Sequence, residues 1–245
     1  MREYGFNTTL LHGSEDKNPF GATQVPIYQS SAFRHDSAEE LEKIFANKTV
    51  GYSYTRINNP TIESFERRMT KLEGGIGSVA TSSGMSALHN ALMNILRNGD
   101  HIVAAAGLYG GTVELLEELQ AYGIRTTYVK ENSPEAFQEA ILPETRAVFA
   151  ETISNPKLDV TDIRGVAEVA HKNGIPFLID NTVATPYLVN PLKLGADVVI
   201  HSSSKYINGS SDAISGILIS GGSFKWDKEK YPGMIPFLKY GCFAY

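Results

Sequence analysis

The chain has 245 residues, of which 42% are hydrophobic, and a formal net charge of −5. This length allows one large domain or two small ones, and a modest negative charge without a basic stripe argues against nucleic acid as a partner. The single cysteine, Cys242, excludes an internal disulfide framework, and no apolar run approaches the roughly 18 residues of a membrane span. Because the N-terminus also lacks the apolar core of a secretory signal, we expect a soluble cytoplasmic protein.

Hydrophobic periodicity divides the chain into an irregular start and a regular remainder. Residues 1–57 show one helix-like patch at 37–46, whereas apolar residues recur at helical spacing in 61–72, 85–96, 113–119 and 163–170, and Ser133-Pro134 marks a further helix start. Short apolar runs predict strands at 79–81, 101–106, 125–129, 147–151, 176–180, 197–201 and 213–220. This alternation predicts an α/β fold, a mostly parallel sheet with helices on both faces. We expect an N-terminal arm, 1–57, followed by an α/β domain, 58–245.

Two charged residues stand at the ends of apolar runs in this domain. Asp180 ends the run 175–180, and Lys205 follows the run 198–200 within a group of three serines. Ligands of such sheets bind beyond the carboxyl ends of the strands, where Asp180, Glu151 and Ser202 fall. A lysine with little solvent around it and an aspartate at a neighbouring strand end are the pair that pyridoxal phosphate needs, one for a Schiff base and one for the ring nitrogen. The alternatives are a surface lysine, and an aspartate that caps a helix or forms an internal salt bridge.

The segment 80–86, ATSSGMS, joins a predicted strand to a predicted helix start. Unsatisfied backbone N–H groups at a helix N-terminus attract an anion, and Gly84 allows a close approach. The segment is therefore either a phosphate cradle or an ordinary N-cap formed by Ser82 or Ser83. It has neither the Gly-Lys-Ser/Thr of a Walker loop nor the frame of a nucleophile elbow.

Three further side chains are ambiguous by themselves. Arg56 is either a bidentate phosphate ligand or a surface arginine, and Tyr109 is either a platform for a flat cofactor or a tyrosine of the core or its rim. None of the six histidines stands at metal-ligand spacing, so we expect no metal, and His201 is interpreted as a strand-end residue.

Taken together and in this order, these residues resemble the Cys/Met-metabolism enzymes that use pyridoxal 5′-phosphate. The resemblance covers essentially the whole chain, from ATQVPIYQSS at 22–31 to GGSFKW at 221–226. It implies the large domain of fold-type I enzymes, which is like that of aspartate aminotransferase. Within the family, the segments at 54–61 and 151–157 and the FKW segment are similar to O-acetylhomoserine sulfhydrylases.

The resemblance also implies roles for individual residues. Lys205 matches the Schiff-base lysine, Asp180 the partner of the ring nitrogen, and Tyr109 the stacking tyrosine. Tyr54 and Arg56 match residues that reach the phosphate in the neighbouring subunit's site, which implies a homodimer or homotetramer with shared active sites. The other expected cofactor-binding residues are Ser83, Gly84, Met85, Asn155, Thr182, Ser202 and Ser204.

The implied reaction is γ-replacement on an O-acylhomoserine by sulfide or a thiol, which gives homocysteine or methionine. Lys205 would move the protons, with Tyr54 or Tyr109 assisting. Cystathionine γ-synthase or γ-lyase activity is the alternative within the family, although Gly111 stands where methionine γ-lyases carry a cysteine.

The sequence departs from the family at three places. Ser204 replaces a threonine, and Gly209-Ser210 replaces a Gly-His pair. The chain also stops before the C-terminal domain that supplies the arginine for the substrate carboxylate, so the expected substrate domain is absent. A truncated fragment that binds the cofactor without catalysis is therefore an alternative of another class.

Overall fold

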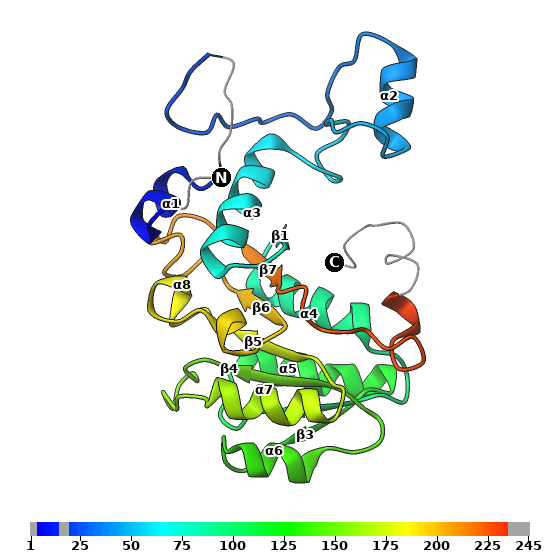
Figure 1. Cartoon of the computed structure of the whole chain (residues 1–245), viewed down its shortest axis with the longest axis vertical. Coiled ribbons are helices and arrows are strands. Elements are labelled where there is room, and N and C mark those ends of the chain that lie inside the picture. Colours follow the sequence, from blue (N-terminus) through cyan, green and yellow to red (C-terminus); the bar gives the residue numbers. More distant parts are fainter. Residues whose placement is uncertain (1–3, 15–19, 235–245) are drawn as a thin grey trace. The chain divides into compact units, whose positions relative to one another are not determined.

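The computed structural model describes residues 4–14 and 20–234, so Cys242 lies outside the described residues (Figure 1). The chain divides into two compact units, Met1–Met69 and Thr70–Tyr245. The division into an N-terminal arm, 1–57, and an α/β domain, 58–245, stays a prediction.

The first unit contains short helices and extended segments. Helix α2, Ala38–Phe45, confirms the predicted patch, and its N-cap Ser37 accepts a hydrogen bond from the amide of Glu40 at 3.1 Å. Helix α1, Phe6–His12, was not predicted, and its N-cap residue is a glycine that offers no side-chain acceptor. Helix α3, Pro60–Glu73, begins with the proline at its first turn and continues into the second unit.

The second unit is built on a seven-stranded sheet in the order β1-β7-β6-β5-β4-β2-β3. Every strand predicted from the sequence is present: β1 Gly77–Thr81, β2 His101–Ala104, β3 Arg125–Tyr128, β4 Thr145–Glu151, β5 Phe177–Asp180, β6 Val198–His201 and β7 Gly216–Ser220. Only β7 runs antiparallel to its neighbours, β1 and β6, in the described sheet. The sheet is therefore mostly parallel, as predicted.

The helices lie on the two faces of this sheet. Helix α4, Gly84–Ile95, and helix α5, Gly110–Glu118, connect strands toward the β3 edge, whereas α6, Pro134–Ala140, and α7, Ile163–Lys172, lead back toward the β1 edge. Right-handed crossovers place these two pairs on opposite faces. Helices α6 and α7 pack against each other, as Figure 1 shows. The shorter elements are η1 Leu119–Tyr122, α8 Thr185–Leu188, η2 Pro191–Leu194 and η3 Pro232–Met234.

The central strands form the core. Ile102, Phe149, Leu178 and Ile200 are fully buried because helices cover both faces, which explains their unbroken apolar runs. Polar side chains begin where β4, β5 and β6 end, at Glu151, Asp180 and His201. No helix in the described part of the chain is long and apolar enough to cross a membrane.

Candidate functional site

A pocket of about 250 Å³ opens at the carboxyl ends of the central strands. Every site residue predicted in the second unit lines it: Ser83, Gly84, Met85, Tyr109, Asn155, Asp180, Thr182, Ser202, Ser204 and Lys205. These residues come from the start of α4, the start of α5, and the loops after β4, β5 and β6. The topology thus assembles residues that are up to 122 positions apart, from Ser83 to Lys205.

Asp180 is the last residue of β5, and one of its oxygens, Oδ1, accepts the amide hydrogen of Thr182 at 2.8 Å. Burial raises the pKa of Asp180, and the hydrogen bonds from Thr182 and the charge of His201 act against that rise. None of the ion pairs among the described residues includes Asp180. A carboxylate in this position is stabilised by a cationic or hydrogen-bonding ligand.

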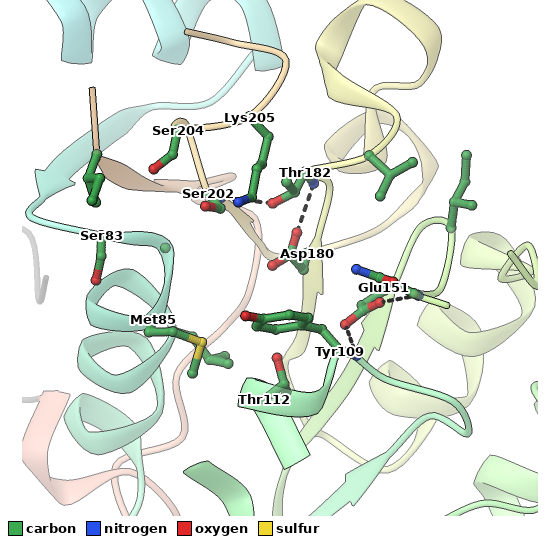
Figure 2. Close-up of a pocket in the computed structure, with 16 residues that line it drawn as sticks. Ser83, Met85, Tyr109, Thr112, Glu151, Asp180, Thr182, Ser202, Ser204 and Lys205 are labelled. Carbon is green, nitrogen blue, oxygen red and sulfur yellow. Dashed lines mark hydrogen bonds between the residues drawn. The ribbon is translucent and has the colours of Figure 1, made fainter. Parts of the chain in front are cut away.

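Lys205 lies in the turn after β6, where its amide donates to the carbonyl of Ser202 at 3.2 Å. Figure 2 shows its side chain extending into the pocket toward Ser202 and Thr182, on the same side of the pocket as Asp180. The expectation of a buried lysine is wrong, because Lys205 is exposed in the structure. Lys205 lies in the loop beyond β6, which ends at His201. The amine therefore reaches both the pocket and solvent.

The start of α4 approaches the end of β6 very closely. A Cβ atom on Gly84 would lie 2.5 Å from the Cβ of Ser202 and 3.0 Å from its hydroxyl oxygen, so a side chain at this position would collide with Ser202. Ser83 is the N-cap, and its hydroxyl accepts the amide hydrogen of Ser86 at 3.1 Å. This cap leaves the first two amides of the helix, those of Gly84 and Met85, available at the pocket wall for an anion. The cap and the cradle are therefore compatible.

Ser202 and Ser204 both line the pocket, but their hydroxyl groups differ. The hydroxyl of Ser204 donates to the carbonyl of Ser215 at 3.1 Å and accepts the amide hydrogen of Ser215 at 3.0 Å. The amide of Ser202 donates to the hydroxyl oxygen of Thr182 at 2.7 Å, while its own hydroxyl faces Gly84. Ser202 is therefore better placed than Ser204 to meet an anion at the start of α4.

Glu151 links two loops of the pocket. It is only 6% exposed, and its two oxygens accept the amide hydrogens of Tyr109 at 2.8 Å and of Asn155 at 3.0 Å (Figure 2). Burial and the nearby charge of Asp180 raise its pKa to about 7, against the effect of these hydrogen bonds. Tyr109, 49% exposed, is thus fixed through its backbone while its ring stays accessible.

Sequence reasoning noted Glu151 as a strand-end residue but did not include it in the site. It also missed Leu88, Thr112, Ile153, Val183 and Ile214 in the pocket wall. A signal existed for Thr112, which follows Tyr109 in the first turn of α5. Ile214 carries no local pattern that would have indicated it.

Tyr54 and Arg56 belong to the first unit and are not among the residues that line this pocket. The guanidinium carbon of Arg56 lies 5.2 Å from the centre of the Tyr54 ring, and the side chain of Tyr54 is 41% exposed. This pair forms a cationic and aromatic surface, and its role in the site stays a prediction.

The pocket residues fit pyridoxal phosphate in the chemistry of their groups. Helix amides and a hydroxyl suit a phosphate, an exposed aromatic ring suits a flat ring, a carboxylate suits a pyridinium nitrogen, and an amine suits an aldehyde. Because Gly84 has no side chain, the start of α4 lies close against Ser202, which brings the helix amides and the Ser202 hydroxyl to the same wall of the pocket. In the described residues, no group of three or more His, Cys, Asp or Glu side chains could hold a metal ion.

Comparisons with known proteins agree with this chemistry. The family model described as Cys/Met metabolism PLP-dependent enzyme matches residues 7–234. The chain is 47% identical to O-acetyl-L-homoserine sulfhydrylase of Corynebacterium glutamicum, covering 93% of this chain and 53% of the relative. It is 43% identical to L-methionine gamma-lyase of Porphyromonas gingivalis, covering 88% of this chain and 54% of the relative. The chain thus spans about half the length of the curated relatives it matches.

Solved structures give the same result for the fold. A crystal structure from Campylobacter jejuni, described as an O-acetylhomoserine (thiol)-lyase with N′-pyridoxyl-lysine-5′-monophosphate, aligns with a TM-score of 0.88 and 32% identity. The alignment covers 94% of this chain and 57% of the other. A cystathionine gamma-lyase from Lactobacillus plantarum aligns with a TM-score of 0.83 and 34% identity, covering 98% of this chain and 60% of the other.

Proposed function

Because the chain belongs to the Cys/Met-metabolism family of pyridoxal-phosphate-dependent enzymes, we propose that its pocket binds pyridoxal 5′-phosphate and serves γ-replacement on an O-acylated homoserine. The observation that carries this proposal is the convergence of Lys205 and Asp180 on one pocket, beside the start of α4. Sulfide or a thiol would replace the γ-acyloxy group at the γ-carbon, which gives homocysteine or methionine and releases the carboxylic acid.

Each of these residues would contact the part of the cofactor that matches its charge and shape. Asp180 receives the ring nitrogen, Lys205 provides the amine that holds the aldehyde carbon, and the ring of Tyr109 provides a stacking surface. The amides of Gly84 and Met85, with the hydroxyl of Ser202, receive the phosphate. The remaining pocket residues support these cofactor-binding groups and hold them in place: Ser83, Asn155, Thr182 and Ser204.

The bound cofactor supplies an electron-withdrawing ring that acidifies the α-carbon of the amino-acid substrate. Lys205 would act as the general base at the α-carbon and would then shuttle a β-proton. Its exposed amine would remove that proton so that the γ-acyloxy group can leave as a carboxylate, and would return it after sulfide or the thiol has added at the γ-carbon. Tyr109, which lines the pocket, or Tyr54 assists these transfers. Asp180, as an anion, keeps the positive charge of the ring nitrogen in place throughout.

Tyr54 and Arg56 would complete the site of a neighbouring subunit, where the guanidinium group meets the phosphate. The active form would then be a homodimer or homotetramer in the cytoplasm. Asn155 would lie near the cofactor's hydroxyl group and the substrate carboxylate.

Elimination is the second candidate reaction, because L-methionine gamma-lyases are among the relatives at 40–43% identity. Gly111 favours replacement over elimination of methionine. A Cβ atom at Gly111 would lie 2.7 Å from Cε1 of Tyr109, so a cysteine in its place would move the ring that this chain keeps free.

The test combines cofactor absorbance with product analysis. Lys205→Ala should abolish the visible absorbance of the bound cofactor and all turnover of O-acetylhomoserine with sulfide, because no other amine lines the pocket of the described chain. Lys172→Ala, at the end of α7 and outside the pocket, should change neither. A Lys205→Ala protein that keeps both properties would refute the assignment.

The products separate the remaining candidates. Homocysteine from sulfide indicates replacement, cystathionine from cysteine indicates the synthase, and 2-oxobutyrate with ammonia indicates elimination. Cofactor binding without any of these products would support the non-catalytic alternative.

A further inference from the structure

Glu151 is a buried carboxylate that is bonded to two separate loops of the pocket. It ends β4, and none of the ion pairs among the described residues includes it. Its Oε1 accepts the amide hydrogen of Tyr109 and its Oε2 that of Asn155, and Figure 2 shows the carboxylate beside Tyr109. Burying a charged group costs free energy unless hydrogen bonds compensate it. Here both compensating donors are backbone amides of residues that line the pocket.

The first of these hydrogen bonds holds the start of α5. Tyr109 is the N-cap residue of this helix, and its carbonyl accepts the amide hydrogens of Thr112 at 2.9 Å and Val113 at 3.1 Å, but its side chain makes no capping hydrogen bond. The amide of Tyr109 lies before the helix and donates to Glu151, which lies 42 positions later at the end of another strand. Because the ring of Tyr109 is 49% exposed, its direction depends on where this backbone is held.

The second hydrogen bond holds the loop after β4. Asn155 lies four positions after Glu151 and donates its amide hydrogen back to that side chain. Farther along the loop, the amide of Ser154 donates to the carbonyl of Asp159 at 2.9 Å, and the hydroxyl of Thr161 donates to the carbonyl of Glu151 at 2.6 Å. The loop therefore returns to Glu151 through both the side chain and the backbone of this residue.

We propose that Glu151 is a positioning residue that sets the spacing between the ring of Tyr109 and the side chain of Asn155, and with it the width of the slot for the cofactor ring. The inference rests on the proposed function, in which Tyr109 stacks on that ring and Asn155 lies near its hydroxyl group. Because each carboxylate oxygen is bonded to a backbone amide, Glu151 acts through these two residues.

The competing explanation is that Glu151 serves only the stability of the fold. Asp197 is a matched control, because it is also a buried carboxylate, and it joins distant segments by accepting hydrogen bonds from the amide of Phe177 and the ring of His171, each at 2.8 Å. Asp197 does not line the pocket. Asp197→Asn therefore makes the same chemical change as Glu151→Gln without a route to Tyr109.

The test measures the binding of pyridoxal phosphate to the cofactor-free chain by equilibrium dialysis at about pH 8. Burial raises the pKa of Glu151 to about 7, so its carboxylate is charged at that pH. Glu151→Gln retains only one acceptor oxygen and should weaken binding about tenfold, the order expected for the loss of one hydrogen bond to a charged group. Inorganic phosphate, measured as a competitor, should bind equally well because it does not use the ring slot. Asp197→Asn should leave both ligands unchanged.

A double-mutant cycle shows whether Glu151 acts through Tyr109. In a Tyr109→Ala background the ring to be positioned is absent, so the effect of Glu151→Gln should fall to about twofold or less. Glu151→Asp keeps the charge, but its shorter side chain cannot reach both amides. It should also weaken pyridoxal phosphate, and it serves if Glu151→Gln does not fold.

Unchanged affinity in both Glu151 variants, or an equal effect of Glu151→Gln with and without the ring of Tyr109, would overturn the inference and leave the proposed function standing. Equal weakening of inorganic phosphate, or equal weakening by Asp197→Asn, would overturn it too, because the effect would then come from the fold as a whole. If the unaltered chain did not bind pyridoxal phosphate, the proposed function itself would fail.

Discussion

Strands β5 and β6 have an aspartate at each of their two ends, Asp197 buried and Asp180 half-buried, and the comparison separates a structural carboxylate from a functional one. At the amino-terminal end, Oδ2 of Asp197 accepts the amide hydrogen of Phe177 at 2.8 Å and a hydrogen bond from His171 at 2.8 Å. At the carboxyl end, Asp180 accepts hydrogen bonds from Thr182, its near neighbour in the chain, and faces the pocket. Burial raises the pKa of both.

The difference lies in what each carboxylate holds. Asp197 fixes a strand and a helix that are far apart in the sequence, so its burial serves the fold. In the described part of the chain, the side chain of Asp180 accepts hydrogen bonds only from its near neighbour Thr182, so it does not hold distant elements together. A carboxylate that is kept for a ligand is expected to lower the stability of the folded chain when the ligand is not bound.

The largest expected effect comes from removing each carboxylate in turn. Asp180→Ala should weaken the binding of pyridoxal phosphate by at least about 30-fold, since losing one partner of a buried charge pair costs about 2–5 kcal/mol. It should leave the unfolding free energy of the cofactor-free chain unchanged or higher. Asp197→Ala should do the reverse, lowering the unfolding free energy by about 1–3 kcal/mol because the buried amide of Phe177 loses its acceptor.

Cofactor titration measures the affinity of both variants for pyridoxal phosphate, and urea denaturation measures their unfolding free energies. If Asp197→Ala lowered the cofactor affinity as strongly as Asp180→Ala, the two ends of the strands would not differ in the way that the hydrogen bonds indicate.

The pH dependence of stability sharpens the same comparison through Glu151. Its pKa rises from 4.5 to about 7 in the folded chain, so the folded state binds a proton that the unfolded state has lost between these pH values. The unfolding free energy should therefore fall as pH rises from about 4.5 to 7, by at most about 3 kcal/mol for this group. Asp180, with its own raised pKa, adds a fall of the same sign.

Glu151→Gln isolates this contribution. Denaturant midpoints of the cofactor-free chain at pH 5 and pH 7.5 should differ less in the variant than in the unaltered chain. An equal difference in both proteins would assign the slope to other carboxyl groups.

Local patterns predicted the strands and the pocket, because short apolar runs report burial and parallel strands end at one edge of a sheet. Asp180 and Ser202 stand directly after such runs, which made them predictable. The partners of buried groups were not predictable in this way. Glu73 meets His201 across 128 residues, and Glu151 meets Tyr109 across 42, with no periodicity that connects them.

Two further differences have local causes. The serines around Lys205 suggested little solvent, but they belong to a turn that projects from the sheet, so the lysine is exposed. Strand β7 has the same apolar composition as its neighbours, and composition does not encode direction, so its antiparallel course was not predicted.

The smallest expected effect concerns the start of α4, where Gly84 and Gly110 form a matched pair. Both are the first residues of helices beside the pocket, but a Cβ atom on Gly84 would lie 2.5 Å from the Cβ of Ser202, whereas one on Gly110 would meet no described atom within 4 Å outside its chain neighbours and its own helix backbone. Gly84→Ala should therefore push α4 away from Ser202, with an overpacking cost of about 1 kcal/mol. The displacement should weaken the binding of pyridoxal phosphate a few-fold, which corresponds to about 1 kcal/mol or less. The binding of pyridoxal, which lacks the phosphate, should be unaffected. Gly110→Ala should change neither ligand, and a loss of pyridoxal affinity in Gly84→Ala would show that the glycine supports the ring instead of the phosphate.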